Sequence, residues 1–294
     1  MFPIIPAASA ADSGNQEGIF GFGKTGSAVG MTNLVSSSGV VASDVAAVGS
    51  ARHQLAACEY GEDKGIFGYG NTGSATAITN LVSNAGVVAT DTAGVGTVRY
   101  TLGACSYGDD KGIFGFGSGL SNTTNLVSNV GVVSTDVAGV GTARSNICAT
   151  EYGGDKGIFG FGNSGSDTAI TNLVSNAGVV ATDTAGVGTA RDYVGACSYG
   201  NDKGIFGFGM TGAYVGMTNL VSNVGVVATD VAAVGTARAD PGATQYDYNK
   251  GIFGYGDTGS YVSMTNLVSN AGVVATDVTG VGTARNHLAA CSFN

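Results

Sequence analysis

The sequence predicts an all-β protein, a closed six-bladed β-propeller with four-stranded blades. Three observations lead to this prediction. A segment of about 47 residues occurs six times, each copy has the composition of several short strands, and the first and last copies are incomplete in complementary ways. Glycine accounts for 51 of the 294 residues, and a hydrophobic content of 44% is high enough for a folded core.

The repeat is marked by the phrase Gly-Ile-Phe-Gly, whose copies lie 47, 47, 45, 47 and 47 residues apart. Each copy is followed by Thr-Asn-Leu-Val-Ser, by Gly-Val-Val, by an Asp, and by an Arg eight residues after that Asp. A period of 40–50 residues with short strands is typical of propeller blades. We therefore expect an N-terminal arm at residues 1–17 and a propeller at residues 18–294. The six units begin near Gly18, Gly65, Gly112, Gly157, Gly204 and Gly251.

Each unit has room for four strands. In the unit around position 65, we expect strands at residues 55–60, 65–69, 77–83 and 87–91, with turns at 61–64 and 84–86. Gly, Asp and Asn in these turns suit tight hairpins.

The two ends of the chain complement each other. The first unit begins with a second strand at residue 18, and the chain ends in a first strand at residues 288–293. The last strand can therefore complete the first blade, which would remove an unpaired sheet edge.

Two resemblances follow from these phrases. An Arg shortly before Leu-Ala-Ala-Cys, then a short Asp-Lys turn and Gly-Ile-Phe-Gly-Phe-Gly, resembles the Kelch repeat over residues 18–294. That resemblance implies a propeller closed by its C-terminal innermost strand. Gly-Phe-Gly or Gly-Tyr-Gly stands where Kelch repeats have a double glycine, and Val-Val stands where they have Trp. The whole repeat is also similar to repeat-rich structural proteins of tailed phages, marine ones in particular, which implies a virion component.

Several residue types recur once per unit, and we interpret them as structural because sites for chemistry are usually asymmetric. The Phe of Gly-Ile-Phe-Gly should pack between blades, with a ligand-stacking platform as the alternative. The repeated Asp and Arg should form ion pairs, with a metal-binding carboxylate ring as the alternative. The Asn of Thr-Asn-Leu should satisfy backbone groups, with a ring that holds a sugar or an ion as the alternative. The Asp-Lys turns should be solvated hairpin tips.

The cysteines should be free and buried. They are Cys58, Cys105, Cys148, Cys197 and Cys291. No Cys-x-x-Cys pair exists, so zinc is not expected. Equivalent positions in neighbouring blades should be too far apart for disulfides.

The charge pattern and the absence of motifs exclude several function classes. The net charge is −9, and the basic residues are spread around the repeats, so we expect no nucleic-acid partner. No apolar run is long enough to span a bilayer, the N-terminus lacks the features of a secretion signal, and no cofactor motif is present. His53 and His287 have no evident third group to orient them, so we expect no enzyme.

The remaining hypothesis is a non-catalytic structural or binding protein. We expect a component of a larger assembly, such as a phage tail or fibre, that contacts other structural proteins through its apolar N-terminal arm. The alternative is a lectin with repeated weak sites for a cell-surface glycan. The expected location is the virion, after folding in the host cytoplasm, with the cell surface or extracellular space as the alternative. The candidate contact residues are Tyr214, Tyr261, Tyr246, Tyr248, Phe2, Ile4 and Ile5.

Overall fold

The computed structural model describes residues 15–232 and 234–294, and the regular elements in these ranges are all β-strands. No helix in these ranges is long and apolar enough to cross a bilayer. The strands form six antiparallel sheets of three strands each, which confirms the all-β prediction. Val, Ile, Phe and Thr between glycines favour short strands over helices.

We number the sheets in chain order. They are sheet 1, β18 (Ala289–Phe293), β1 (Glu17–Lys24) and β2 (Ala28–Val35); sheet 2, β3 (Ala56–Tyr60), β4 (Lys64–Asn71) and β5 (Ala75–Val82); sheet 3, β6 (Gly103–Tyr107), β7 (Lys111–Gly117) and β8 (Ser121–Val127); sheet 4, β9 (Cys148–Tyr152), β10 (Lys156–Gly160) and β11 (Thr171–Val174); sheet 5, β12 (Gly195–Tyr199), β13 (Lys203–Gly207) and β14 (Thr218–Val221); and sheet 6, β15 (Gly242–Tyr246), β16 (Lys250–Asp257) and β17 (Tyr261–Val268).

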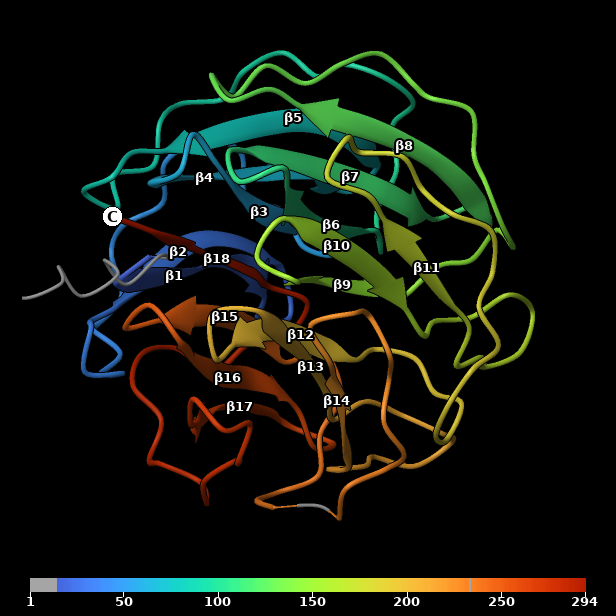
Figure 1. Cartoon of the computed structure of the whole chain (residues 1–294). Coiled ribbons are helices and arrows are strands. Elements are labelled where there is room, and N and C mark those ends of the chain that lie inside the picture. Colours follow the sequence, from blue (N-terminus) through green and yellow to red (C-terminus); the bar gives the residue numbers. More distant parts are fainter. Residues whose placement is uncertain (1–14, 233) are drawn as a thin grey trace, which may run out of the picture.

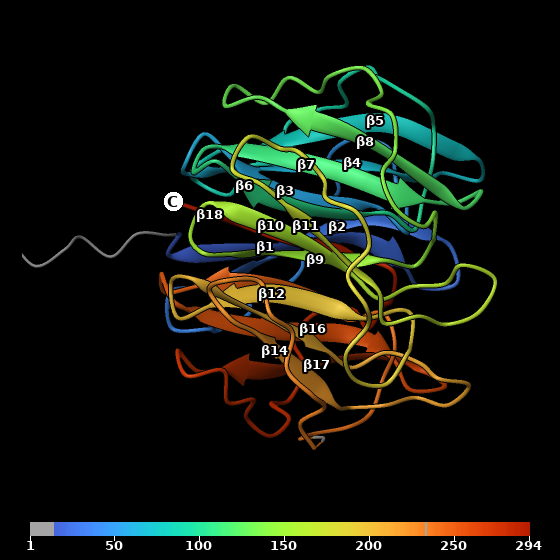
Figure 2. The same cartoon turned by 45° about the vertical axis from the view of Figure 1, so that its right-hand side comes forward.

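The six sheets lie around a common axis (Figures 1 and 2). The inner strands β18, β3, β6, β9, β12 and β15 contact one another in a complete cycle, and β15 meets β18. This arrangement is consistent with a six-bladed propeller.

The pairing of the last strand with the first, predicted from the incomplete terminal units, is present. Strand β18 pairs with β1 from Glu17↔Phe293 to Gly21↔Ala289. The red C-terminal strand therefore lies in the sheet of the blue N-terminal strands (Figure 1).

The fourth strand predicted in each unit is present in the described residues only as isolated bridges. The outer segment of sheet 2 makes only isolated bridges with β5, Val82↔Val88 and Thr79↔Thr92. The two bridged residues are three positions apart on β5 and four positions apart on the outer segment. The outer segment therefore has one extra residue, which interrupts the ladder as in a β-bulge. The side chain of Asn80 fills this gap, because its amide donates to the carbonyl of Ala89 at 2.9 Å.

The predicted Phe positions are core residues between sheets. The ring of Phe67 in sheet 2 lies against Gly21 in sheet 1, where an added Cβ would come within 2.6 Å of the ring. Phe67 and Phe22 also form an edge-to-face pair, with ring centroids 5.2 Å apart. The same contact joins sheet 6 to sheet 1 through Tyr255 and Phe20, which completes the circle.

The repeated Arg residues are fully or almost fully buried, and each connects two sheets. Arg191 donates from Nε to the carbonyl of Phe208, from Nη1 to that of Thr189, and from Nη2 to Oδ1 of Asn219 at 2.7 Å. Its guanidinium also lies 4.2 Å from the ring centroid of Phe161 in sheet 4.

The Asp–Arg ion pairs are confirmed for three units, at 3.9 Å: Arg144–Asp183, Arg191–Asp230 and Arg285–Asp44. The Asp residues bond more closely to a hydroxyl residue two positions before the Arg. In sheet 5, Asp230 accepts hydrogen bonds from the backbone N–H and the hydroxyl of Thr189, the latter at 2.6 Å. These Asp residues thus fix the segment that links neighbouring sheets.

All five cysteines are free and buried, as predicted. Burial raises the pKa of Cys197 to about 12, so its thiol stays protonated at neutral pH. The Sγ of Cys58 would lie 2.5 Å from a Cβ at Gly112 of the neighbouring sheet, so this cysteine packs as a small apolar group.

Candidate binding site at the axial mouth

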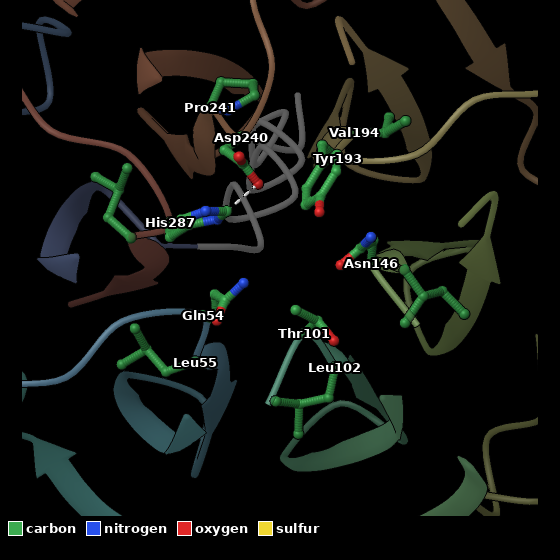
Figure 3. A pocket seen from close by; sticks show the side chains of 12 residues that line it. Gln54, Leu55, Thr101, Leu102, Asn146, Tyr193, Val194, Asp240, Pro241 and His287 are labelled. Carbon is green, nitrogen blue, oxygen red and sulfur yellow. Dashed lines mark ion pairs between the residues drawn. The ribbon is translucent and has the colours of Figure 1, made fainter. Parts of the chain in front are cut away.

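A cavity of about 90 Å³ lies on the axis where the inner strands begin. Each sheet contributes a neighbouring pair of residues to its lining. The outer residues of these pairs are Gln54, Thr101, Asn146, Tyr193, Asp240 and His287, and the inner ones are Leu55, Leu102, Ile147, Val194, Pro241 and Leu288. Figure 3 shows the polar side chains converging on the same opening. We call this cavity the axial mouth.

The backbone of the six polar residues is strained. Their φ angles lie between 51° and 57°, in the left-handed region that favours glycine. Other left-handed positions of the repeat hold glycine, such as Gly96 with φ 82°, a hairpin-tip residue, such as Glu62 with φ 70°, or a buried aromatic residue, such as Phe22 with φ 64°. The six axial residues differ from these in being polar side chains at the mouth that share no residue type, so packing of the repeat does not explain them.

The same positions are the most variable part of the repeat. No residue type recurs among the six units at either position of the dipeptide that follows each Arg. These dipeptides are His53-Gln54, Tyr100-Thr101, Ser145-Asn146, Asp192-Tyr193, Ala239-Asp240 and Asn286-His287. This signal was present in the sequence, but the sequence analysis considered the two histidines of these dipeptides, His53 and His287, and did not compare the six dipeptides.

A second variable ring surrounds the first. It consists of the residues after each Gly-aromatic-Gly: Lys24, Asn71, Ser118, Asn163, Met210 and Asp257. Isolated bridges place several of them beside the dipeptides, among them Lys24↔Asn286 and His53↔Asn71. We call the surface formed by the two rings the mouth face.

The opposite end of the sheets is more uniform. Five hairpin tips hold a Lys–Asp ion pair, such as Lys64–Asp63, with the side chains 40% and 37% exposed. The prediction of solvated hairpin tips is therefore confirmed. The larger cavity at this end, about 420 Å³, has lining residues that include Glu59, Glu151 and Ser198. Glu, Gln and Ser alternate around this ring, whereas the mouth has a different residue in every sheet.

One His–Asp contact lies in the mouth. Nδ1 of His287 lies 3.0 Å from Oδ1 of Asp240 (Figure 3). The expectation that His287 has no orienting group is therefore wrong, since the two residues are distant in sequence and are brought together by the ring. Burial raises the pKa of Asp240, and His287 opposes this rise. The ring of His53 lies 6.0 Å from that of His287, and burial lowers the pKa of His53, with His287 and Lys24 adding to the effect.

A second carboxylate lies beside the mouth. Asn146 donates from Nδ2 to Oδ2 of Asp192 at 2.9 Å. Burial raises the pKa of Asp192 to about 6; the bond from Asn146 opposes this, and the charges of Asp167 and Asp240 add to it.

This pKa gives a testable pH dependence. Because the folded state holds the Asp192 proton more tightly than the unfolded state, its stabilising effect is present below about pH 4 and is lost as pH rises through about 6. We expect the free energy of unfolding to fall by up to about 3 kcal/mol from this residue between pH 4 and pH 7. Urea denaturation across this range should show a weaker pH dependence for Asp192→Asn. Asp167→Asn removes a smaller contribution to the same shift and should keep most of the pH dependence, and matching profiles for wild type and Asp192→Asn would refute the assignment.

The predicted contact residues fall into three groups. Tyr246 is only 3% exposed and belongs to the core, so its assignment to a contact surface is wrong. Its position on the inner strand β15 turns the ring between sheets, as in the equivalent Tyr199. Tyr214 and Tyr261 are partly exposed beside the mouth face, and the Tyr214 hydroxyl donates to Asp257 at 3.2 Å.

The other candidates lie elsewhere. Tyr248 occupies a hairpin tip at the opposite end, with φ 62°. Phe2, Ile4 and Ile5 lie outside the described residues.

Within residues 15–232 and 234–294, no three His, Cys, Asp or Glu side chains lie close enough to hold a metal ion. Comparison with known protein families and with curated proteins finds no match to this chain. The mouth therefore has to be interpreted from its own groups. These are a ring of mixed hydrogen-bond donors and acceptors over an aliphatic floor, an arrangement suited to binding.

Proposed function

We propose that the chain is a closed six-bladed β-propeller that acts as a non-catalytic binding component of a larger assembly, such as a phage tail or fibre. It contacts its protein partner or receptor through the mouth face. The observation that carries this proposal is the variable dipeptide at the strained axial positions. Residues that build the fold recur in every unit, so residues that differ in every unit serve something else.

The variation also bears on the lectin alternative. Equivalent weak sites would need the same side chains in each sheet, as in the repeated Arg and Asn positions. A ring of six different residues instead suits one asymmetric partner, centred on the axis. This favours a single contact over repeated sites.

The assembly role adds the N-terminal arm. Gln16 bonds to the C-terminal residue, because its N–H donates to the carbonyl of Asn294 at 3.0 Å. The described end of the arm thus lies where β18 and β1 meet, and in this proposal the arm makes a separate connection to neighbouring structural proteins. A virion location accords with this role.

The groups in the mouth suit binding better than covalent chemistry. The His287–Asp240 pair could serve as a base, but a nucleophile would also be needed. The one aliphatic hydroxyl among the residues that line the cavity, that of Thr101, donates to the carbonyl of Tyr100 at 2.7 Å.

Photo-cross-linking in the native assembly tests the proposal. A benzophenone amino acid at Tyr193, on the mouth face, should cross-link to one partner molecule, because a surface centred on the axis has room for one partner at a time. The same amino acid at the exposed Asn201, on the opposite end, is the control. Cross-links from Asn201 with none from Tyr193 would contradict the proposal.

A further inference from the structure

Most polar groups that line the axial mouth are neutral hydrogen-bonding groups. Asn146 uses one N–H for Asp192, which leaves its Oδ1 and a second N–H. Gln54 adds an amide, Tyr193 a hydroxyl that can donate and accept, and Thr101 the lone pairs of its hydroxyl oxygen. Both donors and acceptors of hydrogen bonds therefore surround one small opening.

The charged groups of the mouth are already paired. Asp240 faces His287 at 3.0 Å, and Asp192 accepts a bond from Asn146. No Lys or Arg is among the described residues that line the cavity. A cationic ligand would compete with His287 for Asp240, and an anionic ligand would find no Lys or Arg in the lining of the cavity. A neutral ligand fits without either cost.

The shape of the mouth limits the ligand further. A volume of about 90 Å³ equals roughly three water molecules in the liquid, so only the end of a ligand can enter. Below the polar ring lie the six aliphatic side chains, of which Leu55, Leu102 and Leu288 are 4–7% exposed. Such a floor favours C–H groups, and the ring of Tyr193 adds an aromatic wall.

We propose that the axial mouth binds the terminal monosaccharide of a neutral glycan, inserted end-on at one site on the axis. A sugar carries hydroxyls that both donate and accept, on a ring with C–H faces, and these match the polar rim and the aliphatic floor. The inference deepens the proposed function, since it rests on the mouth face being the contact surface. It differs from a repeated-site lectin in having one site per chain.

Saturation-transfer NMR with methyl glycosides tests this inference. The probes are the methyl glycosides of glucose, galactose, mannose, fucose and N-acetylglucosamine at millimolar concentration. At least one should receive saturation from the protein, with one site per chain by titration. Asn146→Ala and, separately, Gln54→Ala should weaken binding about fivefold, because each removes hydrogen bonds to the ligand. Asn201→Ala, on the opposite end, should leave binding unchanged, and unchanged melting temperatures exclude unfolding as the cause.

Three results would overturn the inference. One is that no neutral glycoside binds while the lysine methyl ester or methyl phosphate does, which would assign the mouth to a charged group. Another is binding that neither mouth variant weakens. The third is no binding of any probe, and a protein cross-link from Tyr193 in that case would leave the proposed function standing.

Discussion

Replacing Arg191 with Met is expected to lower the free energy of unfolding by about 3–5 kcal/mol. Met fills much of the volume but donates no hydrogen bond. The carbonyl oxygens of Phe208 and Thr189 and Oδ1 of Asn219 would then lose a buried donor. Urea denaturation of the variant and the wild type at one pH measures the difference.

Two further variants separate hydrogen bonding from charge. Lys203→Met removes the same charge from an exposed ion pair in the same unit, and it should cost less than about 1 kcal/mol. Arg191→Lys keeps the charge but lacks the planar guanidinium, and a single ammonium group cannot reach all three acceptors. It should therefore recover only part of the loss. A full recovery by Lys would show that charge, and not the directed hydrogen bonds, stabilises this junction.

The fold was predictable to the extent that it repeats. Six equivalent phrases revealed the units, and a chain that begins with a second strand and ends with a first revealed the pairing of β18 with β1. The way in which the fourth segment pairs was not predictable from the repeat alone. Its residues have strand-like composition, but a bulge and the side chain of Asn80 replace the ladder with isolated bridges.

The candidate site could be predicted only in part. The dipeptide after each Arg, such as Asp192-Tyr193, was visible as a variable position, but its meaning depends on geometry. The sequence does not show that these residues have positive φ, that they meet on one axis, or that Asp240 faces His287. Tyr246 was assigned to a contact surface because the residues around it differ from the other units. The Tyr itself, however, occupies a position that is buried in the core of every unit.

The closing strand gives the prediction with the largest effect. Deletion of residues 288–294 should prevent stable folding and yield aggregated protein. The deletion removes Leu288, Cys291 and Phe293, which are 7%, 2% and 0% exposed, and it leaves β1 with an unpaired inner edge. Loss of a buried Leu and a buried Phe alone costs about 5–10 kcal/mol, which is comparable to the whole stability of a typical domain.

A circular permutant distinguishes loss of the strand from disturbance of the chain end. The carbonyl of Asn294 accepts a hydrogen bond from the N–H of Gln16, so a short glycine linker can join the C-terminus to residue 15. New termini can be placed at Gly73, in the loop between β4 and β5, where no atom lies within 4 Å of an added Cβ. This permutant converts the β18–β1 junction into a hairpin like those of the other sheets. It should be soluble and at least as stable as the wild type in thermal denaturation. If the truncated chain melted like the wild type, β18 would not be needed to complete the ring. If the permutant failed to fold while the wild type did, the order in which the sheets form, and not only their final pairing, would matter to this protein.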